Sequence, residues 1–192
     1  MCKAARIFVS SMEYKKKSMP ELDRLSRSAF QESQKHPVVL VLDQVRSMNN
    51  VGSIFRTADA FRIESICLCG YTPRPPHRDI QKTALGATET VHWQGFETTL
   101  EAIQAYRNKG YRILGIEQTH QSILLDEIRW TPAEPLLLIF GNEVQGIEDA
   151  VLAQCDAVIE IPQAGSKHSL NVTISAGILL WDIFRAYGRP GH

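Results

Sequence analysis

Apolar runs alternate with stretches of helical periodicity along most of this chain, and this alternation limits the possible folds more than any other feature. The first run, PVVLVLDQV at residues 37–45, is rich in β-branched residues and bounded by proline and charge, which is typical of a strand covered on both faces. Similar runs occupy residues 65–70, 111–116, 136–141 and 157–162. Helix-like stretches span residues 51–61, 96–108, 147–153 and 169–186. The pattern predicts an α/β fold with a mainly parallel sheet flanked by helices.

The length of the chain favours one folded unit. With 192 residues, 44% of them hydrophobic, it can bury a single core. The apolar pattern starts at residue 37, so we expect a domain over residues 37–192, preceded by a basic arm or helix over residues 1–36. The chain has no apolar run of 18 residues and no signal-peptide pattern, and its four cysteines lack disulfide or zinc spacing. We therefore expect a cytoplasmic protein with reduced thiols and no membrane contact.

Charge is distributed unevenly although it balances overall. Lys+Arg and Asp+Glu both number 21, but residues 1–35 hold eight basic and four acidic side chains. Further basic residues follow at Arg46, Arg56, Arg62, Arg74, Arg78 and Lys82. Such clusters favour contact with a phosphate backbone, although a solvated basic surface explains the N-terminal arm equally well. The segment at residues 70–79, with three prolines, predicts a surface loop of the kind that often carries function.

Three polar turns follow predicted strands. In an open parallel sheet, ligands bind beyond the carboxyl ends of the strands. The turn after the first strand contains Asn49 or Asn50 as a possible helix cap, Gly52 as a point of close approach, and Arg56 one helical turn later. The other two turns are GNEVQG at residues 141–146 and SLN at residues 169–171. We interpret the three together as one pocket for a polar, nucleotide-like ligand.

Each turn also has a plain structural explanation. The first could be an ordinary helix start with a surface arginine, the second a tight turn, and Ser169 a simple helix cap. Dinucleotide-binding and P-loop glycine motifs and the G-x-S-x-G nucleophile motif are absent from the sequence. The six histidines show no metal-ligand spacing, so no metal is expected, although His168 lies beside the third turn.

The segments NNVGSIFRTADAF, KTALGATE, LIFGNEVQGI and IEIPQAGSKHSLNVTISAG closely resemble the successive motifs of the SpoU (TrmH-like) branch of the SPOUT RNA methyltransferases. The resemblance extends over about residues 37–187 in the order of the family. It implies a C-terminal deep trefoil knot, a homodimer with a shared site, and S-adenosylmethionine as cofactor. The implied reaction is methyl transfer to a ribose 2′-hydroxyl of RNA, with transfer RNA as the first expectation and ribosomal RNA as the second.

The resemblance also assigns site residues. Those on the catalytic motifs are Asn50, Arg56, Glu143, Ser169 and Asn171. Cofactor contacts are expected from Ile116, Gly141, Asn142, Gly146, Ile161 and Leu170. RNA contacts are expected from Lys15, Lys16, Lys17, Arg46, Arg74, Arg78 and Lys82. In the family the arginine is proposed to activate the hydroxyl, but a guanidinium is a poor base, so Arg56 could instead grip a phosphate.

Two other functions remain open at this point. A knotted protein that binds RNA without turnover would keep the fold, although the intact set Asn50, Arg56, Glu143, Ser169 and Asn171 argues against it. An α/β enzyme acting on a small metabolite would show activity without RNA, and only the balanced net charge favours it.

Overall fold

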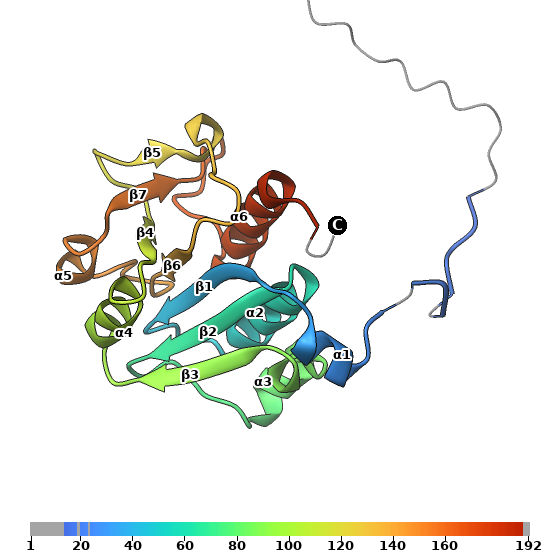
Figure 1. Cartoon of the computed structure of the whole chain (residues 1–192). Coiled ribbons are helices and arrows are strands. Elements are labelled where there is room, and N and C mark those ends of the chain that lie inside the picture. The colour runs from blue at the N-terminus through green and yellow to red at the C-terminus, as the bar shows by residue number, and fades with distance from the viewer. Residues whose placement is uncertain (1–13, 19, 23, 190–192) are drawn as a thin grey trace, which may run out of the picture.

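The computed structural model describes residues 14–18, 20–22 and 24–189, and it contains one parallel sheet (Figure 1). The seven strands lie in the order β3-β2-β1-β6-β4-β7-β5, with every described pairing parallel. Their bounds are β1 His36–Asp43, β2 Ile63–Cys69, β3 His92–Phe96, β4 Arg112–Ile116, β5 Ile123–Leu124, β6 Leu136–Phe140 and β7 Ala157–Glu160. The predicted α/β fold with a mainly parallel sheet is confirmed.

Helices cover both faces of the sheet (Figure 1). They are α1 Arg27–Glu32, α2 Met48–Ala60, α3 Arg78–Ala84, α4 Thr99–Arg107, α5 Asp149–Leu152 and α6 Val172–Tyr187. Short 3₁₀ turns occupy η1 Pro20–Leu22, η2 Ala87–Glu89 and η3 Leu125–Glu127. Alternate residues of β1 point to opposite faces, so Val38 and Leu40 pack in the core with α2, α3 and α6, whereas Val39 and Val41 pack with α4 and α5. This two-sided burial explains why the strands read as continuous apolar runs.

Helix starts differ from the prediction because other residues cap them. We expected Asn49 or Asn50 to cap the first long helix, but the N-cap of α2 is Ser47, whose hydroxyl accepts from the Asn50 N–H at 3.3 Å. The predicted helix from residue 169 starts at Val172, with Asn171 as the N-cap in place of Ser169. Both caps satisfy N–H groups that have no partner within the helix.

The segment after β2 was only partly predicted. It leaves the sheet as an irregular loop, but α3 starts at Arg78, so the expectation that residues 70–79 are entirely irregular is wrong at its end. His77, after the last proline of the segment, caps α3 through its side chain. The helix predicted from residue 96 starts only at Thr99, because Phe96 is the last residue of β3.

Part of the expected N-terminal arm packs on the domain. Phe30 of α1 is buried, and Arg27 and Gln31 contact Glu89 of η2 through its carboxylate and carbonyl oxygens respectively. The basic residues Lys3 and Arg6 lie outside the described residues. Within the described part of the chain, no helix is long and apolar enough to cross a membrane.

Candidate functional site

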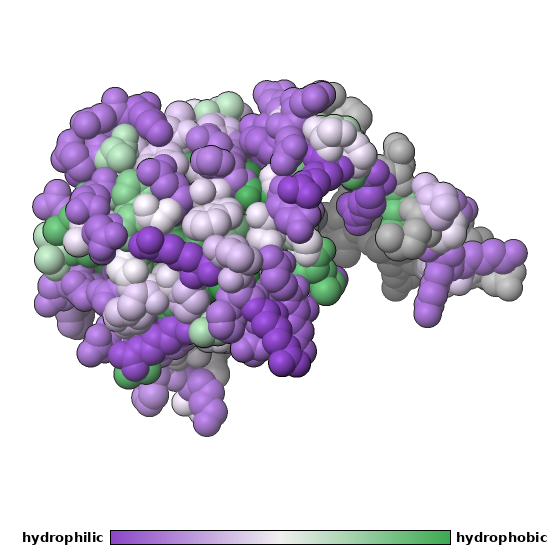
Figure 2. All heavy atoms as spheres, turned by 90° about the horizontal axis from the view of Figure 1, so that it is seen from below, coloured by the Kyte–Doolittle hydropathy of each residue, from purple (hydrophilic) through white to green (hydrophobic). Residues whose placement is uncertain are grey.

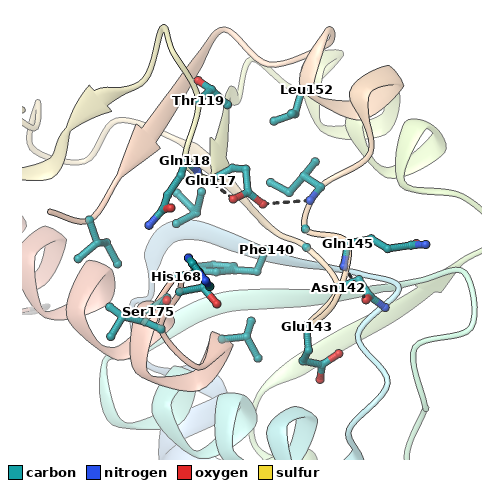
Figure 3. A pocket seen from close by; sticks show the side chains of 18 of the residues that line it. Glu117, Gln118, Thr119, Phe140, Asn142, Glu143, Gln145, Leu152, His168 and Ser175 are labelled. Atoms are coloured by element: carbon teal, nitrogen blue, oxygen red, sulfur yellow. Dashed lines mark hydrogen bonds between the residues drawn. The ribbon is translucent and has the colours of Figure 1, made fainter. Parts of the chain in front are cut away.

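A cavity of about 830 Å³ lies beyond the carboxyl ends of β4, β6 and β7 (Figure 3). Its wall comes from three loops, at residues 116–121, 140–147 and 161–172. Among the residues lining it are all six expected cofactor contacts, Ile116, Gly141, Asn142, Gly146, Ile161 and Leu170. Glu143, His168, Ser169 and Asn171 line it as well. The sequence predicted one pocket shared by three polar turns. The turns after residues 140 and 160 line the cavity, whereas Asn50, Gly52 and Arg56 of the first turn do not, so this prediction is right for two of the three turns.

The loop over residues 141–147 is a tight turn closed by its own backbone. Asn142 and Gly146 exchange two N–H···O hydrogen bonds, of 3.0 and 2.9 Å, and the Asn142 Oδ1 accepts from the N–H groups of Val144 and Gln145. A Cβ on Gly141 would lie 2.2 Å from the Gly146 carbonyl carbon. These glycines allow the two ends of the loop to touch, and their expected contacts with the cofactor stay a prediction.

Glu117, which the sequence analysis missed, lies beside this loop and accepts a hydrogen bond from it (Figure 3). Its Oε2 accepts from the Ile147 N–H at 3.1 Å, and its Oε1 accepts from the Gln118 N–H at 2.8 Å. Gly146 has φ +69°, and a Cβ there would lie 2.3 Å from the Glu117 Oε2. The only sequence signal was its position, directly after a predicted strand end.

Glu143 joins the cavity to the start of α2. Its carboxylate accepts from the backbone N–H groups of Arg46 and Ser47, at 3.1 and 3.2 Å, and from Asn50 Nδ2 at 2.9 Å. Partial burial alone would raise the pKa of Glu143, but these hydrogen bonds outweigh it and lower the pKa below its ordinary value. The carboxylate therefore stays charged and acts as an anchor for the first turn.

The third turn meets the first through asparagine side chains. Asn171 Nδ2 donates to Asn50 Oδ1 at 3.4 Å, while Asn171 Oδ1 caps α6 by accepting from the Thr173 N–H at 2.9 Å. Asn50, Glu143 and Asn171 thus form a connected polar group drawn from all three turns. Ser169 is exposed beside it.

Arg56 stands apart from the cavity. It is exposed on α2, and it makes no hydrogen bond or ion pair with any residue that the structure describes. Gly52, one turn before it, faces α3, where a Cβ would lie 2.2 Å from Thr83 Oγ1. The sequence left open whether Gly52 admits a backbone or a ligand, and the structure shows that it admits the backbone of α3, with the Ile80 carbonyl oxygen 2.3 Å from such a Cβ.

The other expected RNA contacts lie in different places. Arg46 is exposed next to Glu143, whereas the Arg74 guanidinium packs on Gly95 and donates to the Phe96 carbonyl at 3.1 Å. Arg78 and Lys82 are exposed on α3. α3 lies at the lower side of the molecule in Figure 1, and the view from below in Figure 2 shows a largely hydrophilic face. Lys15, Lys16 and Lys17 are exposed before α1.

The described residues offer little other chemistry. Among them, no group of three or more His, Cys, Asp and Glu side chains is arranged to hold a metal ion. The three cysteines in this part of the chain are free, and burial raises the pKa of the Cys67 and Cys69 thiols to about 12. These thiols are poor nucleophiles at neutral pH.

Comparison with known proteins places this geometry in context. Residues 37–181 match the model of the SpoU rRNA methylase family. The chain is 30% identical to the TrmH family tRNA/rRNA methyltransferase YacO of Bacillus subtilis, over 90% of this chain and 68% of that protein. It is 30% identical to the 23S rRNA (guanosine-2′-O-)-methyltransferase RlmB of Nitrosomonas europaea, over 79% of this chain and 57% of that protein.

A solved structure of similar fold is that of an AdoMet-bound rRNA methyltransferase from Sinorhizobium meliloti. It matches with a TM-score of 0.72 and 29% identity, over 84% of this chain and 61% of that one. The chain thus spans about two thirds or less of the length of these proteins, which carry further sequence of their own.

Proposed function

Because the chain belongs to the SpoU rRNA methylase family, we propose that it transfers a methyl group from S-adenosylmethionine to a ribose 2′-hydroxyl of a structured RNA. The main support from the structure is that Glu143 and Asn171, which line one cavity, both hydrogen-bond to Asn50 of the first polar turn. A relative named as a guanosine-2′-O-methyltransferase supports the ribose hydroxyl as acceptor. A structural neighbour described with bound AdoMet supports the donor.

The cavity fits a cofactor of this kind. Its volume of about 830 Å³ lies within the range of roughly 300–1,000 Å³ that is typical of small-molecule sites. Ile116, Phe140, Ile161 and Leu170 provide an apolar wall suited to an aromatic base, and Asn142, Glu143 and Gln118 provide polar contacts. When bound, S-adenosylmethionine supplies a sulfonium that is already a strong methyl donor, so the proposed reaction needs no metal.

The protein must then align the ribose oxygen and help remove its proton. Glu143 holds Asn50 and the first turn in place, and Asn171 ties that turn to α6. Arg56, free on the surface of α2, is the candidate for activating the hydroxyl or for gripping the adjoining phosphate. Both roles require Arg56 to reach an RNA strand outside the cavity.

The path of the chain supports the trefoil knot as part of this proposal. The connection from β4 to β6 passes over α6, since Trp130 Nε1 donates to Asp182 Oδ2 at 2.8 Å and Tyr187 OH donates to the Glu134 carbonyl at 2.7 Å. α6 comes from the strand β7 on the far side of β4 and packs beside α2. A C-terminal segment passing through the loop of residues 117–135 would account for both contacts.

A homodimer is the second part of the proposal. α6 leaves Ile174, Ile178 and Trp181 exposed at fractions of 52, 38 and 53%, at helical spacing along one face. Large exposed apolar side chains in one row are typical of an interaction surface. A second copy would also bring another exposed Arg56, so the site could be completed between subunits.

The experiment is a methyl-transfer assay with labelled S-adenosylmethionine. Transfer RNA and ribosomal RNA from cells lacking the gene are tested as two separate substrates, because the names of the two relatives above mention one or both of these RNAs. Mass spectrometry should then find a 2′-O-methylated nucleoside that is absent without the protein. An RNA substrate is also the basis for a cytoplasmic location in this proposal.

Binding of RNA with no transfer to either RNA class would instead support an inactive RNA-binding protein. Calorimetry with S-adenosylmethionine alone separates the methyltransferase from the inactive RNA-binding protein. The cavity of a methyltransferase should bind S-adenosylmethionine with saturable heat, and this measurement does not require the RNA target. Turnover of a small metabolite in the absence of RNA would contradict both proposals.

A further inference from the structure

Tyr71, the residue after Gly70 at the end of β2, lies where the first polar turn meets the cavity wall. Its hydroxyl accepts from Asn142 Nδ2 at 2.8 Å and from Arg46 Nε at 3.4 Å. Asn142 belongs to the wall of the cavity, and the Arg46 backbone donates to Glu143. The hydroxyl is therefore fixed to the site, yet the Tyr71 side chain remains 50% exposed.

Arg46 lies against the same ring. Its guanidinium carbon is 5.7 Å from the centre of the Tyr71 ring, within the range of a cation–π contact. An exposed aromatic side chain with an exposed arginine beside it is the combination with which proteins bind unstacked RNA bases and the phosphates between them.

The loop that bears Tyr71 is held rigidly. Thr72 is only 2% exposed, and its hydroxyl donates to the Leu42 carbonyl and accepts from the Val45 N–H, both at 3.0 Å. This one side chain ties the loop after β2 to the loop after β1. A platform fixed in advance loses little conformational entropy when a base stacks on it.

We propose that the Tyr71 ring stacks on a base of the RNA at the entrance to the cavity, with Arg46 contacting the neighbouring phosphate. The inference rests on the proposed function and adds a residue that binds the substrate. The hydroxyl has its own role, because it bonds to Asn142 and orients the ring. Stacking and orientation belong to different atoms of Tyr71, so substitutions can separate them.

The test compares three variants of the full chain on the RNA that the wild type methylates. Tyr71→Trp and Tyr71→Phe keep an aromatic face, whereas Tyr71→Ala removes it. Because stacking on one base contributes to the binding free energy of RNA, Tyr71→Ala should lower kcat/KM for RNA about tenfold or more, mainly by raising KM. Tyr71→Phe should lose clearly less, and the affinity of Tyr71→Ala for S-adenosylmethionine should stay within about twofold of wild type.

Leu100, 43% exposed on α4, provides the matched control, because Leu100→Ala also removes an exposed apolar side chain and should leave kcat/KM unchanged. A second measurement does not depend on turnover. The fluorescence of Tyr71→Trp should be quenched when the RNA is added, beyond the quenching seen in wild type, because stacking brings a base against the indole.

The inference is wrong if Tyr71→Phe is as damaging as Tyr71→Ala, since the hydroxyl alone would then matter. It is also wrong if Tyr71→Ala leaves KM for RNA unchanged or if Tyr71→Trp shows no added quenching. A wild-type protein that methylates no RNA refutes the proposed function itself, whereas an active wild type with an unaffected Tyr71→Ala refutes only the role of Tyr71.

Discussion

Arg56 is the site residue whose two candidate roles, activating the hydroxyl or gripping a phosphate, can be tested most directly by substitution. It is exposed and unpaired among the described residues, so Arg56→Ala should leave the melting temperature and the affinity for S-adenosylmethionine unchanged. If Arg56 acts on the ribose or its phosphate, kcat/KM for RNA should fall at least about 100-fold. Steady-state kinetics and thermal unfolding provide the two measurements.

Arg56→Lys then separates the two roles. Lysine keeps the positive charge but loses the planar pair of donors that grips a phosphate. A bidentate grip therefore predicts a large loss in Arg56→Lys as well, mainly in KM. Full activity of Arg56→Ala would contradict any part for this residue in the reaction.

Glu143 anchors the first turn as a charged acceptor. The Glu143 carboxylate faces three hydrogen-bond donors, from Arg46, Ser47 and Asn50. The amide nitrogen in Glu143→Gln is itself a donor, so it finds no acceptor there. Because the residue is exposed, we expect a loss of only about 1 kcal/mol in the free energy of unfolding, measured by urea denaturation. The loss in kcat/KM for methyl transfer, expressed as a free energy, should exceed the loss in the free energy of unfolding.

Glu97→Gln is the control for Glu143→Gln, since Glu97 is exposed and makes no hydrogen bond to any described residue. The lowered pKa of Glu143 also fixes a direction with pH. Its contribution to stability is present above its unfolded pKa, near 4.5, and is lost as the pH falls through the lower folded value. Activity that survives in Glu143→Gln unchanged would show that the anchor is dispensable.

At the level of elements, the α2–α3 contact depends on Gly52. A Cβ there would lie 2.2 Å from Thr83 Oγ1 and 2.3 Å from the Ile80 carbonyl oxygen, so Gly52→Ala must push the two helices apart. Overpacking of this kind costs typically about 1–3 kcal/mol, and the melting temperature should fall accordingly. Ser53→Ala is the control on the same helix, because the Ser53 hydroxyl donates only to the Asn49 carbonyl one turn earlier. This substitution should change the melting temperature little.

The same packing explains what sequence reasoning could find. The central strands were predicted because both faces are buried, whereas β3, HWQGF, is an edge strand without a single fully buried residue and gave no apolar run. α3 buries only Ile80 and Ala84 and follows a proline-rich loop, so its periodicity was too short to recognise. The contact of α3 with Gly52 likewise could not be predicted from the sequence.

The site divides along similar lines. Asn50, Glu143 and Asn171 were found because each lies in a polar turn after a buried strand, where the topology of a parallel sheet brings the turns together. Glu117 and Tyr71 also follow strands, but their roles depend on contacts with residues that lie between 25 and 71 positions away in the sequence. Such pairings are set by the register of the sheet and not by any local pattern.

For the whole molecule, the proposed homodimer depends on the row of exposed apolar side chains on α6. If Ile174, Ile178 and Trp181 form the dimer surface, Trp181→Glu should turn a dimer into a monomer, because it would bury an unpaired charge. Light scattering after size exclusion measures the mass. Leu100→Glu, which places the same charge on exposed α4, should remain dimeric, and a wild-type monomer at micromolar concentration would refute the proposed dimer.

The pH stability of the whole domain should depend on His36, where the start of β1 meets the end of α6. His36 is 6% exposed, its ring lies 5.7 Å from the rings of Phe184 and Tyr187, and its Nε2 has no hydrogen-bond partner within the described residues. Burial, and secondarily the charge of Arg62, lowers the pKa of His36 below its ordinary 6.5. The folded state therefore holds this ring neutral.

Protonation of His36 must accordingly oppose folding. The unfolded chain binds the proton near pH 6.5 and the folded chain only at lower pH, so stability is full above 6.5 and declines as the pH falls from there to the folded pKa. His36→Phe keeps an aromatic ring against Phe184 and should lose less stability than wild type between pH 7 and 5, measured by urea unfolding at each pH. His92→Asn, which removes an exposed histidine from β3, should keep the wild-type slope; equal slopes in wild type and His36→Phe would mean that the buried ring is not what titrates.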